Sequence, residues 1–148
     1  MVGDDPDVLV TAAWLHDIGY APDLVDSGFH PLDGARFLRR ARVDERIVGL
    51  VAHQSCALIE ADERGLYEEL SIEYPREESA IADALWYCDM TTSPDGDRLS
   101  ASSRLDEIKI RYGPDHVVTR SIARAEAEIL AAVHRTENRL QRVRLGNS

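Results

Sequence analysis

The chain has 148 residues, of which 44% are hydrophobic, and a net charge of −10 at pH 7. This length suits one domain, and a chain of this size buries roughly two-thirds of the surface that its unfolded form exposes. The acidic balance argues against a nucleic-acid surface, because no basic stripe is present to release counterions from a phosphate backbone. We therefore expect a single domain over residues 1–148 that does not bind nucleic acid.

The first predicted helix ends at a charged couplet, His16-Asp17. Residues 5–7 supply an N-cap, a proline at the first helical position and an acidic first turn, and Gly19 supplies the stop. The residues between are apolar nearly all round, so we expect this helix to run through the middle of the domain, with Trp14 in the core. A carboxylate buried beside an imidazole is costly without a compensating partner, so a metal site is the first hypothesis.

Three further His or Asp residues occur at the ends of predicted helices. His30 precedes a helix start, His53 lies near the end of a helix over 45–54, and Asp89 lies at the end of a core-facing helix over 76–90. Each has a structural alternative: a helix cap for His30, a satisfied histidine for His53 and a helix-terminal residue for Asp89. An acid at a helix C-terminus opposes the helix dipole, which favours a metal-binding role for Asp89.

The remaining segments also read as helical. Residues 57–70 are mixed and acidic, 93–97 form a turn, a helix over 103–113 ends at Gly-Pro, and 115–142 is the longest helix, with one apolar stripe. No segment shows convincing period-two alternation, so the predicted class is all-α.

Cysteines and arginines give weaker signals. Cys56 and Cys88 match no zinc-finger spacing and are expected to be small buried residues. Trp86 is expected to pack in the core. Five arginines are expected mostly on solvated faces: Arg36, Arg39, Arg40, Arg64 and Arg104. One of the five could bind a phosphate, and the sequence does not say which.

The order of these motifs resembles the HD superfamily of metal-dependent phosphohydrolases. His16-Asp17-Ile18-Gly19 is similar to the family's His-Asp-Ile-Gly signature, and Asp89 matches its closing aspartate. His30 and His53 resemble the additional histidines of two-metal members. The resemblance covers residues 7–92 and implies a single all-α, HD-type helical bundle, with C-terminal helices over 100–143 as an addition.

The resemblance also implies an activity: hydrolysis of a phosphate ester or anhydride of a small, nucleotide-like substrate. It implies His16, Asp17, Asp89, His30 and His53 as metal ligands, and Asp17, His30 and His53 as catalytic residues. One or two divalent ions would be held, with Mn²⁺, Mg²⁺, Fe²⁺ and Zn²⁺ as the candidates.

Two positions depart from the family pattern. The family's first histidine lies upstream of the couplet, but residues 1–15 contain no histidine. Either the chain begins upstream of Met1, or the site lacks that ligand. Gln54 stands where two-metal members carry a second histidine of a pair, and an amide is a poor ligand for a transition metal. The alternative function is therefore a non-catalytic HD domain that binds a nucleotide or metal or has a structural role.

The sequence also bears on where the protein is located and whether it assembles. No apolar stretch approaches the ~20 residues that span a bilayer, and the acidic N-terminus lacks the basic region of a signal peptide. We expect a cytoplasmic protein without membrane contact. The long last helix could form a homodimer.

Overall fold

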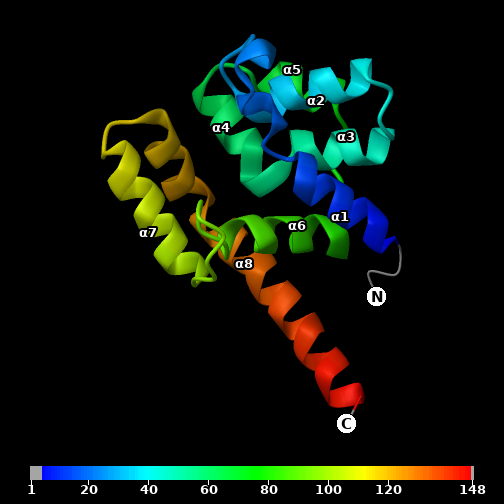
Figure 1. Cartoon of the computed structure of the whole chain (residues 1–148). Coiled ribbons are helices and arrows are strands. Elements are labelled where there is room, and N and C mark those ends of the chain that lie inside the picture. The colour runs from blue at the N-terminus through cyan, green and yellow to red at the C-terminus, as the bar shows by residue number, and fades with distance from the viewer. Residues whose placement is uncertain (1–4, 148) are drawn as a thin grey trace.

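The computed structural model describes residues 5–147, so Met1 to Asp4 and Ser148 of the predicted 1–148 domain lie outside the described residues. All regular structure in this range is helical apart from one isolated bridge between Thr92 and Arg98 (Figure 1). The predicted all-α class is confirmed. No helix in the described range combines the length and the apolar character needed to cross a membrane.

The helices follow one another with short connections. The first part of the chain forms α1 (Pro6–Leu15), the short 3₁₀ helices η2 (Ile18–Tyr20) and η3 (Pro22–Leu24), α2 (His30–Arg40) and α3 (Glu45–Ala52). The middle part forms η4 (Gln54–Cys56), α4 (Ala57–Glu63), α5 (Tyr67–Glu73) and α6 (Ala80–Met90). The last part forms α7 (Ala101–Tyr112) and α8 (Val117–Gly146).

Side-chain caps set several of the helix starts. Asp5, Asp44, Ser79 and Ser100 each accept a hydrogen bond from a backbone N–H in the first turn of α1, α3, α6 and α7. The predicted starts at Asp5 and Asp44 are therefore confirmed. The helix predicted over 76–90 begins later, at Ala80, because Ser79 caps it.

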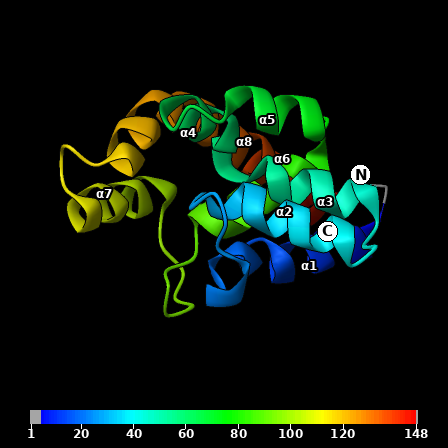
Figure 2. The same cartoon turned by 90° about the horizontal axis from the view of Figure 1, so that it is seen from above.

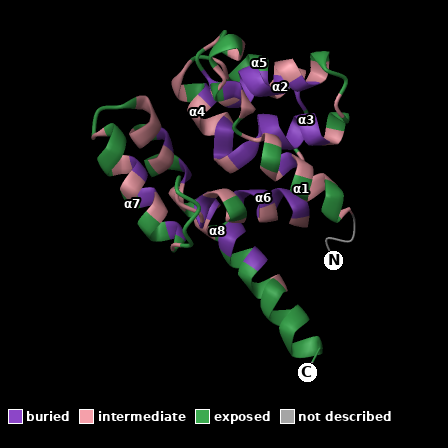
Figure 3. Ribbon diagram, viewed as in Figure 1, coloured by how far each residue is buried: buried purple, intermediate pink, exposed green. Residues whose placement is uncertain are grey.

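The core lies where α6 and the middle of α8 pack together and where α2 and α3 pack together. Buried residues concentrate in α2, α3 and α6 and continue along one side of the first two-thirds of α8, and the last turns of α8 project from the body (Figure 3). Seen from above, α7 lies on the opposite side of the molecule from α2 and α3 (Figure 2). α8 contacts α4, α6 and α7, so it joins the two sides.

Two sequence predictions about burial are wrong. α1 packs against α3 and α6 on one side only: Ala12 is its buried residue, and the Trp14 side chain is 84% exposed. Trp86 is buried as predicted, and its indole N–H donates to the carbonyl oxygen of His53. Cys56 is buried, but Cys88 is exposed.

The segment predicted as one mixed stretch over 57–70 is two helices. Gly65, with φ +72°, ends α4, and α5 begins two residues later. A glycine at this left-handed position has no β-carbon to strain, which makes it a common helix stop.

Candidate metal centre

His16 lies at the C-terminal end of α1, held by its own backbone. Its ring Nδ1 is 2.7 Å from the carbonyl oxygen of Ala13, and a carbonyl only accepts, so Nδ1 carries the hydrogen. The other ring nitrogen, Nε2, faces two carboxylates: Asp17 Oδ2 at 3.2 Å and Asp89 Oδ1 at 3.6 Å. A backbone contact that fixes one ring nitrogen and presents the other is typical of metal-binding histidines.

The electrostatics of His16 follow from these contacts. Burial on its own would lower the pKa of the imidazole, but the hydrogen bonds to Asp17 and Asp89 outweigh burial and raise the pKa to about 11. The two carboxylates therefore favour the positively charged form of the ring. The region between the Asp17 and Asp89 carboxylates therefore favours a positive charge.

Asp17 connects His16 to a second histidine. Its Oδ1 lies 3.5 Å from His30 Nε2, while its Oδ2 faces His16. Burial raises the pKa of Asp17, but the hydrogen bonds to His16 and His30 prevail and hold the pKa well below its usual range. We name His16, Asp17, His30 and Asp89 together the His-Asp cluster.

His30 is positioned by the close approach of η2 to the start of α2. The Tyr20 ring stacks on the His30 ring, with centroids 3.9 Å apart and an interplanar angle of 17°. A β-carbon at Gly19 would overlap the carbonyl oxygen of His30 and lie 2.8 Å from the amide nitrogen of Gly34. The glycine of the couplet's motif therefore permits the contact that brings His30 to Asp17.

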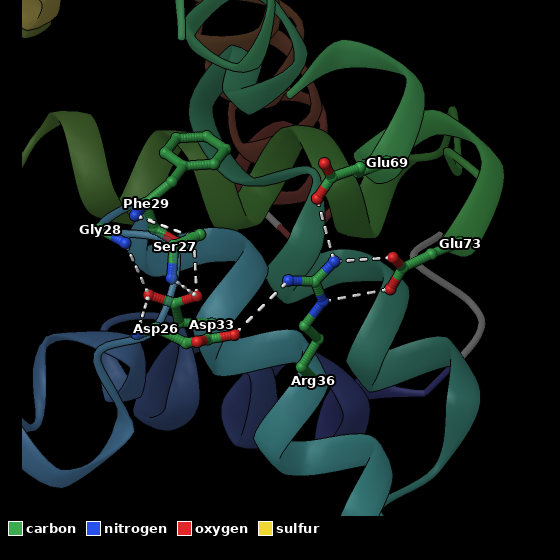
Figure 4. Close-up of polar contacts among 8 residues, drawn as sticks. All are labelled: Asp26, Ser27, Gly28, Phe29, Asp33, Arg36, Glu69 and Glu73. Carbon is green, nitrogen blue, oxygen red and sulfur yellow. Dashed lines mark hydrogen bonds and ion pairs between the residues drawn. The ribbon is translucent and has the colours of Figure 1, made fainter. Parts of the chain in front are cut away.

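The loop before α2 is tied to that helix by Asp33. The buried Asp33 carboxylate accepts hydrogen bonds from the backbone N–H groups of Asp26, Ser27 and Gly28 and from the Ser27 hydroxyl (Figure 4). Nearby, Arg36 binds Glu69 and Glu73, which fastens α2 to α5 (Figure 4). These contacts fix the position from which His30 projects.

Asp89 is held from the opposite side by a residue that the sequence analysis did not single out. The Ser55 hydroxyl donates to Asp89 Oδ2 at 2.6 Å. Ser55 and Cys56 both have left-handed backbone conformations, with φ of 43° and 59°. Such conformations cost of order 1–3 kcal/mol for residues other than glycine, and they occur often at functional sites. Ser-Cys carries no turn signature, so the sequence offers no signal for this contact.

The structure does not bring His53 to the cluster. Its Nε2 lies 2.7 Å from the carbonyl oxygen of Tyr74, and its Nδ1 is buried without a hydrogen-bond partner among the described residues. The next residue, Gln54, faces the cluster instead: its amide donates to the carbonyl oxygen of His16 at 2.5 Å. Gln54 therefore supports the backbone of the couplet, and His53 is removed from the predicted ligands and catalytic residues.

A cavity of about 480 Å³ opens beside the cluster. Its lining includes Asp17, His30 and Asp89 of the cluster together with residues of α7 and α8. This volume suits a small organic ligand.

A family model for the HD domain matches residues 1–88. The chain belongs to the HD domain family. No curated protein and no solved structure matched the chain. The HD domain places the chain in a superfamily of metal-dependent phosphohydrolases, and the matched residues include the His16-Asp17 couplet.

The HD match ends one residue before Asp89. Residues from Asp89 onward, including α7 and α8, lie beyond the match and still contribute Asp89 and one wall of the cavity. The HD domain thus supplies the couplet and His30, and the following helices complete the site.

The side chains of the His-Asp cluster are not arranged around a single metal position. Within residues 5–147, no group of three or more His, Cys, Asp and Glu side chains is arranged as it stands to hold a metal ion. The donor chemistry nevertheless fits a divalent ion, because two imidazoles and two carboxylates are common ligands of Zn²⁺, Mn²⁺ and Fe²⁺. Ligand atoms about 2.1 Å from one ion lie roughly 3.0–3.4 Å apart, and the His16–Asp17 contact of 3.2 Å falls in that range.

Proposed function

We propose that this HD domain is a metal-dependent phosphohydrolase that cleaves a phosphate ester or anhydride of a small, nucleotide-like substrate. The observation that carries the proposal is the position of Asp17, which contacts His16 through one carboxylate oxygen and His30 through the other, beside a cavity. A carboxylate shared between two histidines can bind one ion or bridge two.

The proposed ligands are His16, Asp17 and Asp89, with His30 as a ligand of a second ion or a contact to substrate. A bound divalent ion would lower the pKa of a coordinated water toward neutrality and stabilise the charge that develops on phosphorus. The chain's own groups do the positioning. Ala13 fixes the His16 ring, Ser55 fixes Asp89, and Tyr20 fixes His30.

The first test is Mn²⁺ binding by calorimetry, with Asp17→Ala as the variant and Asp95→Ala as its control. Asp95 is an exposed carboxylate in the turn after α6, so its loss should leave binding unchanged. We expect wild type and Asp95→Ala to bind Mn²⁺ and Asp17→Ala to lose binding. Equal Mn²⁺ binding by all three proteins would contradict the assigned site.

The second test is turnover of a panel of nucleoside mono-, di- and triphosphates in Mn²⁺, Mg²⁺, Fe²⁺ or Zn²⁺. Phosphate release should require the metal and should fall by about 10²-fold or more in Asp17→Ala and His30→Asn. Release that neither variant reduces would come from a contaminating phosphatase and would argue against the proposal.

A second candidate is a non-catalytic HD domain that binds a nucleotide or stabilises the fold. The contacts of His16 Nε2 with Asp17 and Asp89 favour it, because an imidazole between two carboxylates can hold them together as a structural link. This candidate predicts nucleotide binding without metal and no turnover after metal addition.

A further inference from the structure

The cavity beside the His-Asp cluster has a second polar end, on α7. Of the described residues that line the cavity, Arg104 and Arg111 are the only arginines or lysines. Three other arginines considered as phosphate ligands do not line the cavity. Arg36 pairs with Glu69 and Glu73, Arg39 with Glu45, and Arg64 with Glu60 and the Phe29 ring. The positive charge in the cavity wall therefore comes from one helix.

Arg104 has unused hydrogen-bonding capacity. Its side chain is 13% exposed, its Nη1 donates to Glu107 Oε2 at 2.5 Å, and its Nε is buried without a partner. A buried donor without an acceptor is costly, and an oxyanion accepts from the Nε edge of a guanidinium in a paired geometry. Because Nε is closed to solvent as it stands, a ligand anion at this wall would remove that cost once the guanidinium turns its Nε edge toward the cavity.

The local charge balance also favours an anion. Glu107 is shared between Arg104 and Arg111, which donates to it from its Nη2 at 3.0 Å. Two guanidinium groups against one carboxylate leave an excess positive charge on the wall. The carboxylates that line the cavity lie on other elements: Asp17, Asp89 and Glu60, of which Glu60 pairs with Arg64.

Apolar side chains lie along the cavity as well. Met90, Ile108, Val118 and Ile122 contribute to its lining, together with Ala125 on α8. An apolar or planar part of a ligand would pack against these residues and lose contact with water.

Building on the proposed function, we propose that Arg104 forms an anion subsite that selects substrates with a second anionic group. Such a substrate presents one phosphoryl group to the His-Asp cluster, an apolar or planar body to α8, and a second phosphate or carboxylate to Arg104. Arg104 then determines specificity and takes no part in the bond cleavage.

The test compares matched ligand pairs that differ only in the second anion. The pairs are adenosine 5′-monophosphate with adenosine 3′,5′-bisphosphate, and phenyl phosphate with 4-carboxyphenyl phosphate. Calorimetry measures each affinity on the full chain, once with EDTA and once with Mn²⁺. We expect the doubly anionic member of a pair to bind about tenfold more tightly or better.

Arg104→Gln should reduce that preference to about onefold, and Arg142→Gln, on the exposed end of α8, should preserve it. If Arg104→Gln does not fold, as judged by circular dichroism, Arg104→Lys replaces it: it keeps the charge, loses the planar fork and should lower the preference only in part. In turnover assays, Arg104→Gln should raise KM for the doubly anionic substrate and leave kcat unchanged.

The outcomes separate this proposal from the proposed function. A preference that depends on Arg104 without metal-dependent turnover would support the subsite and overturn the hydrolase proposal. Turnover with equal affinity for both members of each pair, or a preference that Arg104→Gln leaves intact, would overturn the subsite alone. Equal or undetectable binding of both pairs in both conditions would also overturn it.

Discussion

At the scale of single residues, Gly19 permits the contact between η2 and α2, since a side chain there would overlap the His30 carbonyl. We expect Gly19→Ala to lower the free energy of unfolding by about 1–3 kcal/mol, as overpacking in a close contact does. Urea denaturation measures this change. The same variant should weaken Mn²⁺ binding, because the backbone of His30 must move away from Asp17.

Gly146→Ala is the matched control. No atom lies within 4 Å of a β-carbon at this position, near the end of α8, so the free energy of unfolding should change by less than about 0.5 kcal/mol. Equal losses in the two variants would show that the close approach at Gly19 contributes nothing particular to stability.

The lowered pKa of His53 should make the stability of the protein depend on pH. Burial lowers its pKa, the carbonyl oxygen of Tyr74 opposes this effect, and the charge of Arg76 adds to the lowering. A histidine whose pKa in the folded state lies below its ordinary value of 6.5 takes up a proton more readily when unfolded. Its contribution to stability is therefore complete above about pH 6.5 and declines as the pH falls through the folded pKa.

His53→Gln keeps a side-chain donor for Tyr74 and removes the titration. Between pH 7.5 and 5.5, urea denaturation should show a larger loss of unfolding free energy for the wild type than for the variant. A loss of the same size in both proteins would mean that His53 does not titrate differently in the folded and unfolded states.

These residues also show where sequence reasoning reaches its limit. The couplet, His30 and Asp89 were predictable because each lies at a helix end that local signals define. His53 and Gln54 are neighbours at such an end, where adjacent side chains point about 100° apart, so spacing alone cannot tell which of them faces the site. The choice depends on the left-handed turn at Ser55 and Cys56, for which the sequence gives no sign.

At the scale of helices, Asp83 joins α6 to α8. Its carboxylate, 12% exposed, accepts hydrogen bonds from Arg135 at 2.7 and 2.9 Å and from Arg139 at 2.8 Å. Hydrogen bonds between charged groups contribute about 1.5–3 kcal/mol each when the groups are little exposed. Both arginines are partly exposed, so screening by solvent reduces this contribution. We expect Asp83→Asn to lower the free energy of unfolding by about 1–3 kcal/mol, measured by urea denaturation.

Asp62→Asn is the control, because it also removes the charge of a carboxylate that pairs with an arginine of α8. Asp62 pairs with Arg124 across the α4–α8 contact, but both side chains are about half exposed. Exposed pairs contribute about 0–1 kcal/mol, so this variant should change stability little. The assignment of Asp83 as the main polar link would be wrong if Asp62→Asn were the more destabilising change.

The helices themselves were predictable to different degrees. The start of α1 was predictable because Asp5 and Pro6 act within one turn. The exposure of Trp14 was not, because an apolar helix does not reveal which of its sides other helices cover. The division of 57–70 into α4 and α5 depends on Gly65, a single residue within an acidic stretch that reads as helical throughout.

At the scale of the whole molecule, α8 has a structural part and a projecting part. Ser121, Ala125, Ile129 and Val133 are buried, whereas every described residue from Leu140 to Asn147 is exposed. We expect a chain that ends at Arg139 to keep its melting temperature within about 2 °C, because it loses no buried contact. Differential scanning calorimetry measures this, and a chain that ends at Gly113 should not fold, since it lacks the α8 core.

The same shortened chain tests the predicted homodimer. Leu140 and Val143 lie about one turn apart and are 42% and 48% exposed, so they are the apolar residues that a partner helix would cover. Sedimentation should then give a dimer for the full chain and a monomer for the chain ending at Arg139. Identical masses for the two chains would exclude this helix end as the dimer contact.

The division of the cavity between two parts of the chain has an evolutionary consequence. The couplet and His30 belong to the family segment, and Arg104 with the apolar lining of α8 lies after it. Under the proposals made above, reaction type and ligand preference are inherited on separate stretches of sequence. Substitutions at the cavity-lining positions of α7 and α8 can therefore change the substrate, while the buried face of α8 and the His16-Asp17 couplet stay unaltered.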